Sequence, residues 1–299
     1  MRKLTKVLLF GLLFGSIATK VFATGQAEQA KAPTSGPVYK ETITIAQGSD
    51  QNYMDGQMNN TNDVLLRACY SQLVRRGADN KIIGDLAESW DVSDDGLTWT
   101  FHLHKGVKFH SGKELTARDV KASYDRLLDP AQKVRYSALV QGYISKCNVV
   151  DDYTVQLVTP KPIAPMLANL CHRSNLILNS DYIDKYGADL GLTAESVDGT
   201  GPYKLVKWDR GQEMVLERFD DYFKGAVPTK TLDILIVTDA NARLVALQTG
   251  EVDIATVLIS DYQTVKDDPK LKLEIFDSVG SYGLQFNCAN TYMKDPKVR

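Results

Sequence analysis

The sequence predicts an α/β fold, and three consecutive segments near its carboxyl end carry that prediction. Residues 232–237 are almost continuously apolar, as in a strand buried on both faces of a mainly parallel sheet. Thr238 or Asp239 can cap a helix over 240–248. Gly250 would end that helix, and a second strand pattern follows it. We therefore expect a strand-helix-strand crossover, a unit that is right-handed in nearly all proteins.

The amino-terminal residues predict export. A basic start and an apolar run over 7–18 are followed by small residues that end at Ala23. This order is typical of a cleaved signal peptide over 1–23. The apolar run is shorter than the roughly 20 residues that a membrane span needs, although an anchoring first helix is the alternative. Residues 24–40 lack apolar periodicity, which predicts a flexible tether.

Composition and cysteine positions narrow the class of protein. Hydrophobic residues make up 43% and charged residues 24%, as in a packed globular domain. The formal net charge of −2 gives no electrostatic footprint for nucleic acid, so no nucleic-acid partner is expected. The first cysteine is Cys69, so no cysteine directly follows the apolar run to carry a lipid. A periplasmic or other extracytoplasmic location is expected.

Local patterns predict the elements of the first half. Trp99, Phe101 and Leu103 share one face of their strand by the period of two. Thr116 is a good cap for a helix that Pro130 stops. The expected elements are a strand over 41–46, a polar loop over 48–62, a helix carrying Val64, Leu65, Cys69 and Leu73 behind Asn62 or Asp63, a hairpin over 90–105 that turns at 93–96, a strand over 153–157 and helical turns over 165–170.

The second half continues in the same way. The glycine-rich run over 198–203 precedes a strand and lacks the phosphate-loop pattern, so it predicts a turn. A hairpin is expected over 203–218 around Asp209, Arg210 and Gly211. The remaining expected elements are a strand from Val252, a helix over 261–266, and strands over 271–275 and 282–286.

Cysteines and histidines leave alternatives open. Cys147 and Cys171 could form one disulfide in an oxidising compartment, or each could be an isolated buried thiol. His102 and His104 share one face of a strand and could in principle bind a metal. No further ligand is near them in sequence, which favours structural roles, and we expect neither a metal site nor a cofactor.

Several long motifs together resemble one protein family. They are Leu86-Ala87-Glu88-Ser89-Trp90, residues 93–101, residues 106–110, residues 115–120, residues 199–203, and residues 246–253. In this order they resemble the family 5 extracellular solute-binding proteins, of the dipeptide, oligopeptide and nickel type of ABC importers. The resemblance runs from about Thr42 to the last residue and is far more specific than any single short pattern.

The resemblance implies a periplasmic-binding-protein-like fold of two lobes, type II, with an extra subdomain. Proteins of this family extend well past 299 residues, so the chain would hold mainly the first lobe and the extra subdomain, truncated at the carboxyl end. The implied division is a first lobe over 41–73 and 196–287, an extra subdomain over 74–195, and a hinge with the start of the second lobe over 288–299.

The resemblance also implies where a ligand is held. The loop after the first strand corresponds to a family loop that reaches the ligand, and two tyrosines lie where the family places residues beside the cleft. The implied ligand-binding residues are Ser49, Asn52, Tyr53, Met54, Asp55, Tyr136 and Tyr282. An ordinary solvated turn at 53–55 and a packing role for Tyr136 are the alternatives. Most clamping residues of the family lie in the second lobe.

The implied function is capture of peptides or similar small solutes for the permease subunits of an ABC importer. No catalytic motif such as G-x-S-x-G or H-E-x-x-H occurs, so no enzyme activity is expected. Two alternatives remain open: an exported hydrolase, and a chemosensory or chaperone-like binding module on the same fold.

Overall fold

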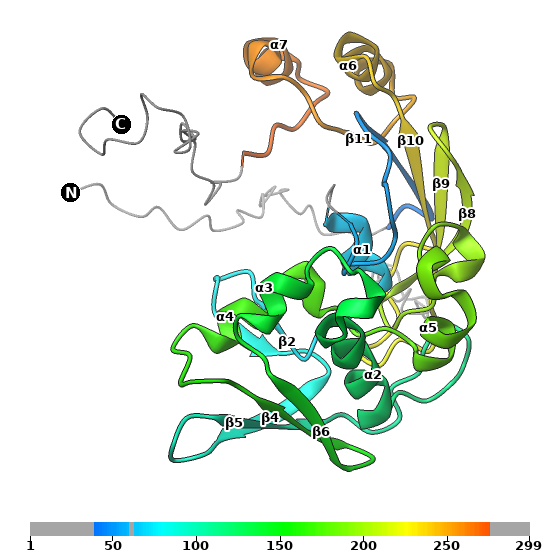
Figure 1. The fold of residues 1–299 in the computed structure, drawn as a ribbon. Helices are drawn as coiled ribbons and strands as arrows, with labels where there is room; N and C mark the ends of the chain where they lie inside the picture. Colours follow the sequence, from blue (N-terminus) through cyan, green and yellow to red (C-terminus); the bar gives the residue numbers. More distant parts are fainter. Residues whose placement is uncertain (1–38, 60–62, 276–299) are drawn as a thin grey trace, which may run out of the picture. The chain divides into compact units, whose positions relative to one another are not determined.

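The computed structural model describes residues 39–59 and 63–275 (Figure 1). Predictions for the signal peptide, most of the tether, the strand over 282–286, Tyr282, Cys288 and the hinge fall outside these residues. Within the described part, no helix has both the length and the apolar character to cross a membrane.

Along the described chain, strands occur singly or in runs that are separated by helices. The strands are β1 Thr42–Gln47, β2 Val74–Arg76, β3 Ile82–Gly84, β4 Ala87–Val92, β5 Thr98–Leu103, β6 Lys146–Asp151, β7 Thr154–Val158, β8 Tyr203–Asp209, β9 Glu213–Arg218, β10 Thr231–Ile236 and β11 Ile254–Ala255. The helices are α1 Val64–Cys69, α2 Ala117–Leu128, α3 Ser137–Gln141, α4 Met166–Leu170, α5 Ser180–Tyr186, α6 Ala240–Thr249 and α7 Tyr262–Asp267. Short 3-10 turns lie at Pro130–Gln132, Arg173–Asn175, Gly187–Asp189, Ala194–Ser196 and Ile259–Asp261.

The larger sheet has the strand order β11-β1-β10-β9-β8 (Figure 1). β1 runs parallel to both β10 and β11, which confirms the predicted crossover through α6. β9 is antiparallel to β10 and to β8, so the sheet is mixed rather than mainly parallel. The antiparallel half arises from the predicted hairpin around Arg210, because a short turn can join only antiparallel strands.

Both faces of the larger sheet are covered near its centre. Ile45 of β1 and Ile234 of β10 belong to the core that includes α1. Ala46 and Leu235, one position later on each strand, pack with Ala246 of α6 on the other side. Successive side chains of a strand point to opposite faces, so β10 needs apolar residues at consecutive positions.

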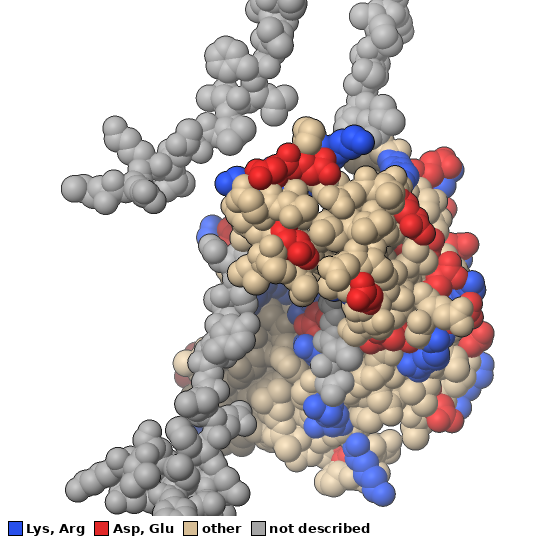
Figure 2. All heavy atoms as spheres, turned by 90° about the horizontal axis from the view of Figure 1, so that it is seen from above, with Lys and Arg blue, Asp and Glu red and all other residues tan. Residues whose placement is uncertain are grey.

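The smaller sheet is antiparallel, with the order β4-β5-β7-β6, and β2 pairs with β3. Phe101 and Leu103 are buried in its core and Trp99 packs against that core, as the period of two predicts. Helix α2 contacts β6 and β7 and covers this sheet from one side (Figure 1). On the face in Figure 2, acidic and basic side chains of the described residues are interspersed.

Helix α2 begins where the sequence predicts. The carboxylate of Asp119 accepts hydrogen bonds from the backbone N–H of Thr116 at 3.0 Å and from its hydroxyl at 3.3 Å. The same carboxylate accepts from the backbone N–H and the hydroxyl of Ser180, at 3.1 and 2.7 Å. These bonds hold the pKa of Asp119 below its usual value although burial opposes them. One side chain thereby fixes the starts of α2 and α5.

Three predictions of element extent are wrong. Helix α1 ends at Cys69, so Leu73 lies beyond it, although it is buried in the smaller sheet's core. β11 has only two residues, and 271–275 form no strand. Alternating apolar residues suffice for a strand pattern, but a strand also needs a neighbour with which to pair.

The cysteine alternatives are resolved for two of the thiols. Cys147 and Cys171 are both free, so the suggested disulfide is wrong. Cys147 is fully buried in the core of the smaller sheet, and burial raises its pKa to about 12. The thiol of Cys171 donates to the carbonyl of Leu167 at 3.3 Å. Both behave as small apolar residues.

The glycine-rich run over 198–203 is a close crossing of two backbones. A Cβ at Gly199 would collide with the carbonyl oxygen of Cys69 at the end of α1. The N–H of Gly201 donates to the same carbonyl at 2.9 Å. Asp198 fastens the run by accepting from the N–H and hydroxyl of Ser111, at 2.8 and 2.7 Å. Only glycine leaves room for this approach.

Replacing Gly199 by alanine should destabilise the fold. We expect Gly199→Ala to lower the free energy of unfolding by about 2–3 kcal/mol, because the new Cβ forces two backbones apart. Urea denaturation measures the difference. Gly77→Ala is the matched control, since its Cβ would crowd only the movable end of the Asp79 side chain, at 3.1 Å, while Ile83 and the carbonyl of Lys81 lie at ordinary contact distance. Equal losses in the two variants would contradict the proposed crossing.

A neutral histidine stabilises the same crossing. The ring of His110 donates from Nε2 to the carbonyl of Gly201 at 3.0 Å, and its Nδ1 accepts from the N–H of Gly199 at 3.4 Å. Burial lowers the pKa of His110, although the bond to Gly201 and the charge of Asp198 oppose that shift.

The stability of the protein should therefore depend on pH through His110. Its pKa is lower in the folded than in the unfolded state, so the unfolded state binds more protons, and stability falls as pH drops below about 6.5. We expect His110→Gln to flatten the curve of unfolding free energy against pH between about 6.5 and 5. Chemical denaturation at a series of pH values tests this. An unchanged slope would show that His110 does not carry the effect.

Candidate functional site

The loop that follows β1 is held to the smaller sheet by a buried ion pair. The carboxylate of Asp55 lies 2.8 Å from Nη1 of Arg126 on α2, and the side chains are 0% and 6% exposed. Gln57 completes the cluster, since its Oε1 accepts from Arg126 at 2.9 Å and its Nε2 donates to the carbonyl of Ser123 at 2.9 Å. Buried charges are stable only when they are paired and hydrogen-bonded in this way.

The start of the loop is clamped to the β8–β9 hairpin. Asp50 accepts hydrogen bonds from Nε1 of Trp208 at 3.0 Å and from the N–H of Gly211 at 2.8 Å. The guanidinium of Arg210 lies over the Trp208 ring, 3.6 Å from its centre. Arg210 also donates to the carbonyl of Gln51 at 2.9 Å. The hairpin turn therefore fixes the course of the backbone around 50–52.

A third group of contacts lies at the end of the loop. The hydroxyl of Tyr136 donates to the carbonyl of Asn59 at 3.0 Å, and its ring meets His172 edge-on with centres 4.9 Å apart. Arg173 forms an ion pair with Asp63 at 2.7 Å and donates to the side-chain oxygen of Asn59 at 3.3 Å. These residues bring the chain near 136 and 172 against the loop.

The predicted ligand-binding residues differ in how far they are exposed to solvent. Ser49 is exposed, while Asn52 and Tyr53 are half-buried within the same loop. Met54 and Asp55 are fully buried, and in this arrangement both serve to anchor the loop. Tyr136 is half-buried and lies at the loop's far end through Asn59. Six of the seven residues therefore belong to one region, and the seventh, Tyr282, lies outside the described residues.

Sequence reasoning missed the residues that hold this loop. Arg126, Trp208 and Arg210 lie far along the chain from their partners, and Arg126 is 71 residues from Asp55. No local pattern reveals such pairs. The one available signal is that Arg126 lies beside Leu127 near the apolar face of the amphipathic helix α2, because an arginine that becomes buried needs a charged partner.

The described residues contain no group of three or more histidine, cysteine, aspartate or glutamate side chains placed to hold a metal ion. His102 and His104 each contact a carboxylate instead, Asp91 and Glu88 respectively, both at 3.0 Å. The arrangement around the loop is suited to binding: a backbone segment with its polar groups fixed in position, flanked by an aromatic ring.

Comparison with known proteins adds the family. Residues 81–299 match the family described as bacterial extracellular solute-binding proteins, family 5 Middle. The chain belongs to this family. The predicted resemblance is confirmed, and with it the periplasmic-binding-protein-like fold.

Relatives of this family 5 protein bind different solutes. The glutathione-binding protein GsiB of Pectobacterium atrosepticum is 31% identical over 275 residues, which are 90% of this chain and 52% of that protein. The periplasmic binding protein DppA of Helicobacter pylori, solved with the peptide STSA, is 28% identical with a TM-score of 0.71, over 76% of this chain and 49% of that one.

A third relative binds a metal complex. NikZ of Campylobacter jejuni, solved with Ni(L-His), is 25% identical with a TM-score of 0.77, over 87% of this chain and 52% of that one. The family 5 chain described here spans about half the length of the curated relatives that it matches.

Breaking the buried ion pair should cost far more than breaking an exposed one. We expect Arg126→Met to lower the free energy of unfolding by about 3–5 kcal/mol, because Asp55 would remain buried without its partner. Lys121→Met is the matched control on the same helix. Lys121 pairs with Asp125 at 2.6 Å in solvent, so its loss should cost about 1 kcal/mol or less. Urea denaturation of both variants decides, and similar losses would contradict the anchoring role.

Proposed function

We propose that this protein is the solute-binding component of an ABC importer and captures peptides or similar small solutes for the permease subunits. Membership of family 5 is the observation that carries the proposal. The relatives bind glutathione, a peptide and a nickel complex, and two of these three ligands favour a peptide-like solute. Capture without turnover follows from the same proposal.

The proposed binding surface is the loop after β1, which Asp50 holds near its start and the Asp55–Arg126 ion pair holds near its middle. Ser49, Asn52 and Tyr53 would contact the solute, and Tyr136 would border it. A loop whose backbone is already fixed loses little conformational entropy on binding, which favours affinity. Backbone N–H and C=O groups can bond the main chain of a peptide whatever its side chains are. Met54 and Asp55 would act indirectly by holding this surface in place.

We also propose the domain division and the location that the sequence implies. Residues 41–73 and 196–287 would form the first lobe, and 74–195 the extra subdomain, while 1–23 would be a cleaved signal peptide. The structure adds one detail to the proposed boundaries. Leu176, Leu178 and Leu190 pack in the core of the larger sheet, so in this division the end of the subdomain segment would contribute to the first lobe.

Ligand titration tests the proposal. The purified protein is titrated by calorimetry with glutathione, with the tetrapeptide Ser-Thr-Ser-Ala and with the nickel–histidine complex. We expect saturable binding of a peptide-like ligand, and Tyr53→Ala should weaken it about tenfold, because an aromatic contact in a binding site is worth about 1–2 kcal/mol.

The control for this titration is Tyr39→Ala, which removes an exposed tyrosine just before β1. It should leave the affinity unchanged. Mass spectrometry of the peptide after incubation checks for cleavage. Hydrolysis by the purified protein would favour the exported hydrolase, and failure of all three ligands to bind would overturn the proposed solute class.

A further inference from the structure

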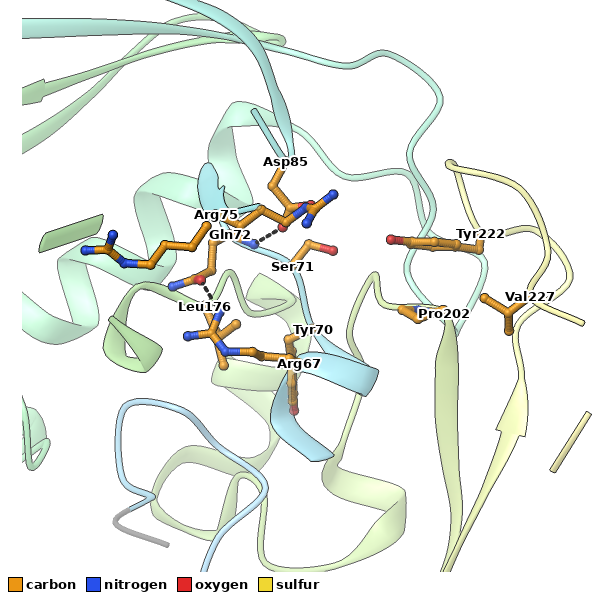
Figure 3. A pocket seen from close by; sticks show the side chains of 11 residues that line it. Arg67, Tyr70, Ser71, Gln72, Arg75, Asp85, Leu176, Pro202, Tyr222 and Val227 are labelled. Atoms are coloured by element: carbon orange, nitrogen blue, oxygen red, sulfur yellow. Dashed lines mark hydrogen bonds and ion pairs between the residues drawn. The ribbon is translucent and has the colours of Figure 1, made fainter. Parts of the chain in front are cut away.

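A hollow lies at the end of the larger sheet that is opposite the loop over 48–59, which is the proposed ligand loop. The loop leaves β1 after Gln47, whereas the strand register places Thr42, Thr231 and Tyr203 at the other end. The hollow adjoins that end and has a volume of about 380 Å³. The polar residues of its lining include Arg67, Ser71, Arg75, Arg76, Asp85 and Tyr222 (Figure 3).

Positive charge exceeds negative charge around this pocket. Three arginines line it, and Asp85 is the one carboxylate among the lining residues. Asp85 is already engaged, because it forms an ion pair with Lys224, lies 3.5 Å from Nε of Arg75, and accepts from the N–H of Gln72 at 2.9 Å. A single carboxylate therefore cannot neutralise the surrounding cations.

The other two arginines keep donors available. Arg67 donates to the side chain of Gln72 at 2.9 Å and to the carbonyl of Cys171 at 3.0 Å, and it lies 3.7 Å from Asp63. Arg76 makes one long bond to the carbonyl of Asn80 at 3.4 Å. A guanidinium has five N–H donors, so these contacts leave several unused.

Two hydroxyl groups point toward each other across the pocket. Figure 3 shows Ser71 and Tyr222 approaching from opposite sides, one from the segment before β2 and the other from the loop after β9. The Tyr222 ring is positioned by an edge-to-face contact with Phe223, with ring centres 5.1 Å apart. Burial, together with the charge of Asp85, raises the pKa of Tyr222 to about 12, so its phenol remains a hydrogen-bond donor at neutral pH.

We propose that this pocket binds a small organic anion through a carboxylate or phosphate group. Guanidinium groups bind both groups in bidentate fashion, and the Tyr222 hydroxyl can supply a further donor, whereas the Ser71 hydroxyl already donates to the carbonyl of Thr200 at 3.4 Å. Leu176, Pro202 and Val227 form an apolar side of the wall, which suits a ligand with a carbon skeleton. The volume lies within the range of small-molecule sites. This site is separate from the ligand loop and does not depend on the proposed function.

Titration with two anions tests the site and separates its two chemistries. Citrate supplies carboxylates and inorganic phosphate supplies the other group, each titrated by calorimetry at low ionic strength. We expect saturable binding of at least one of them. Raising the salt to about 0.15 M should weaken it, because the arginines are partly exposed and their charges are screened over about 8 Å.

Variants then locate the binding. Arg76→Gln should weaken it about tenfold, as expected when one charge-assisted pair is lost. Tyr222→Phe keeps the ring and should weaken it about threefold through the lost hydroxyl. Arg118→Gln is the matched control, since Arg118 is exposed and does not line the pocket. Denaturation midpoints of all variants exclude loss of folding as the cause.

Each outcome has one meaning. Binding that falls in Arg76→Gln and Tyr222→Phe but persists in Arg118→Gln and in Tyr53→Ala supports the pocket. Failure of both anions to bind, or equal binding by all variants, overturns it. Because Tyr53 belongs to the ligand loop, loss of anion binding in Tyr53→Ala would place the anion at that loop and would also overturn the inference. Failure of peptide binding leaves this result unaffected.

Discussion

The ion pair between Asp55 and Arg126 joins the two sheets of the described chain. Asp55 lies in the loop that follows β1 of the larger sheet, and Arg126 belongs to the helix that covers the smaller sheet. Because both charges are buried, neither side chain can turn to solvent without leaving the other charge unpaired in apolar surroundings. The loop that carries Asp55 is therefore held in one conformation, and the proposed binding surface depends on that conformation.

Directional polar contacts hold the ligand loop at three points, and the buried side chain of Met54 adds an apolar anchor. Asp50 and Arg210 hold its beginning, the Asp55 cluster holds its middle, and Asn59 is held at its end by Tyr136. Hydrogen bonds are directional, so such anchors fix the orientation of a backbone more narrowly than apolar contacts do.

Much of the fold was predictable because its information is local. The cap at Thr116, the hairpin turn at Gly211 and the strand-helix-strand pattern around α6 are each encoded within a few residues. The failures share a different cause. The extent of β11, the missing strand over 271–275 and the burial of Asp55 all depend on a partner elsewhere in the chain. The family resemblance predicts a ligand-contacting loop after β1, and the structure distinguishes the exposed Ser49 of that loop from its buried residues Met54 and Asp55.

The buried thiols give each sheet a built-in reporter. Cys69 lies in the core of the larger sheet and Cys147 in that of the smaller, and burial raises the pKa of each to about 12. Since the thiolate is the reactive form, alkylating reagents can modify these positions only when the surrounding core opens. The rate of modification at each thiol thus measures local opening of one core, and comparing the two shows whether the cores open together or independently.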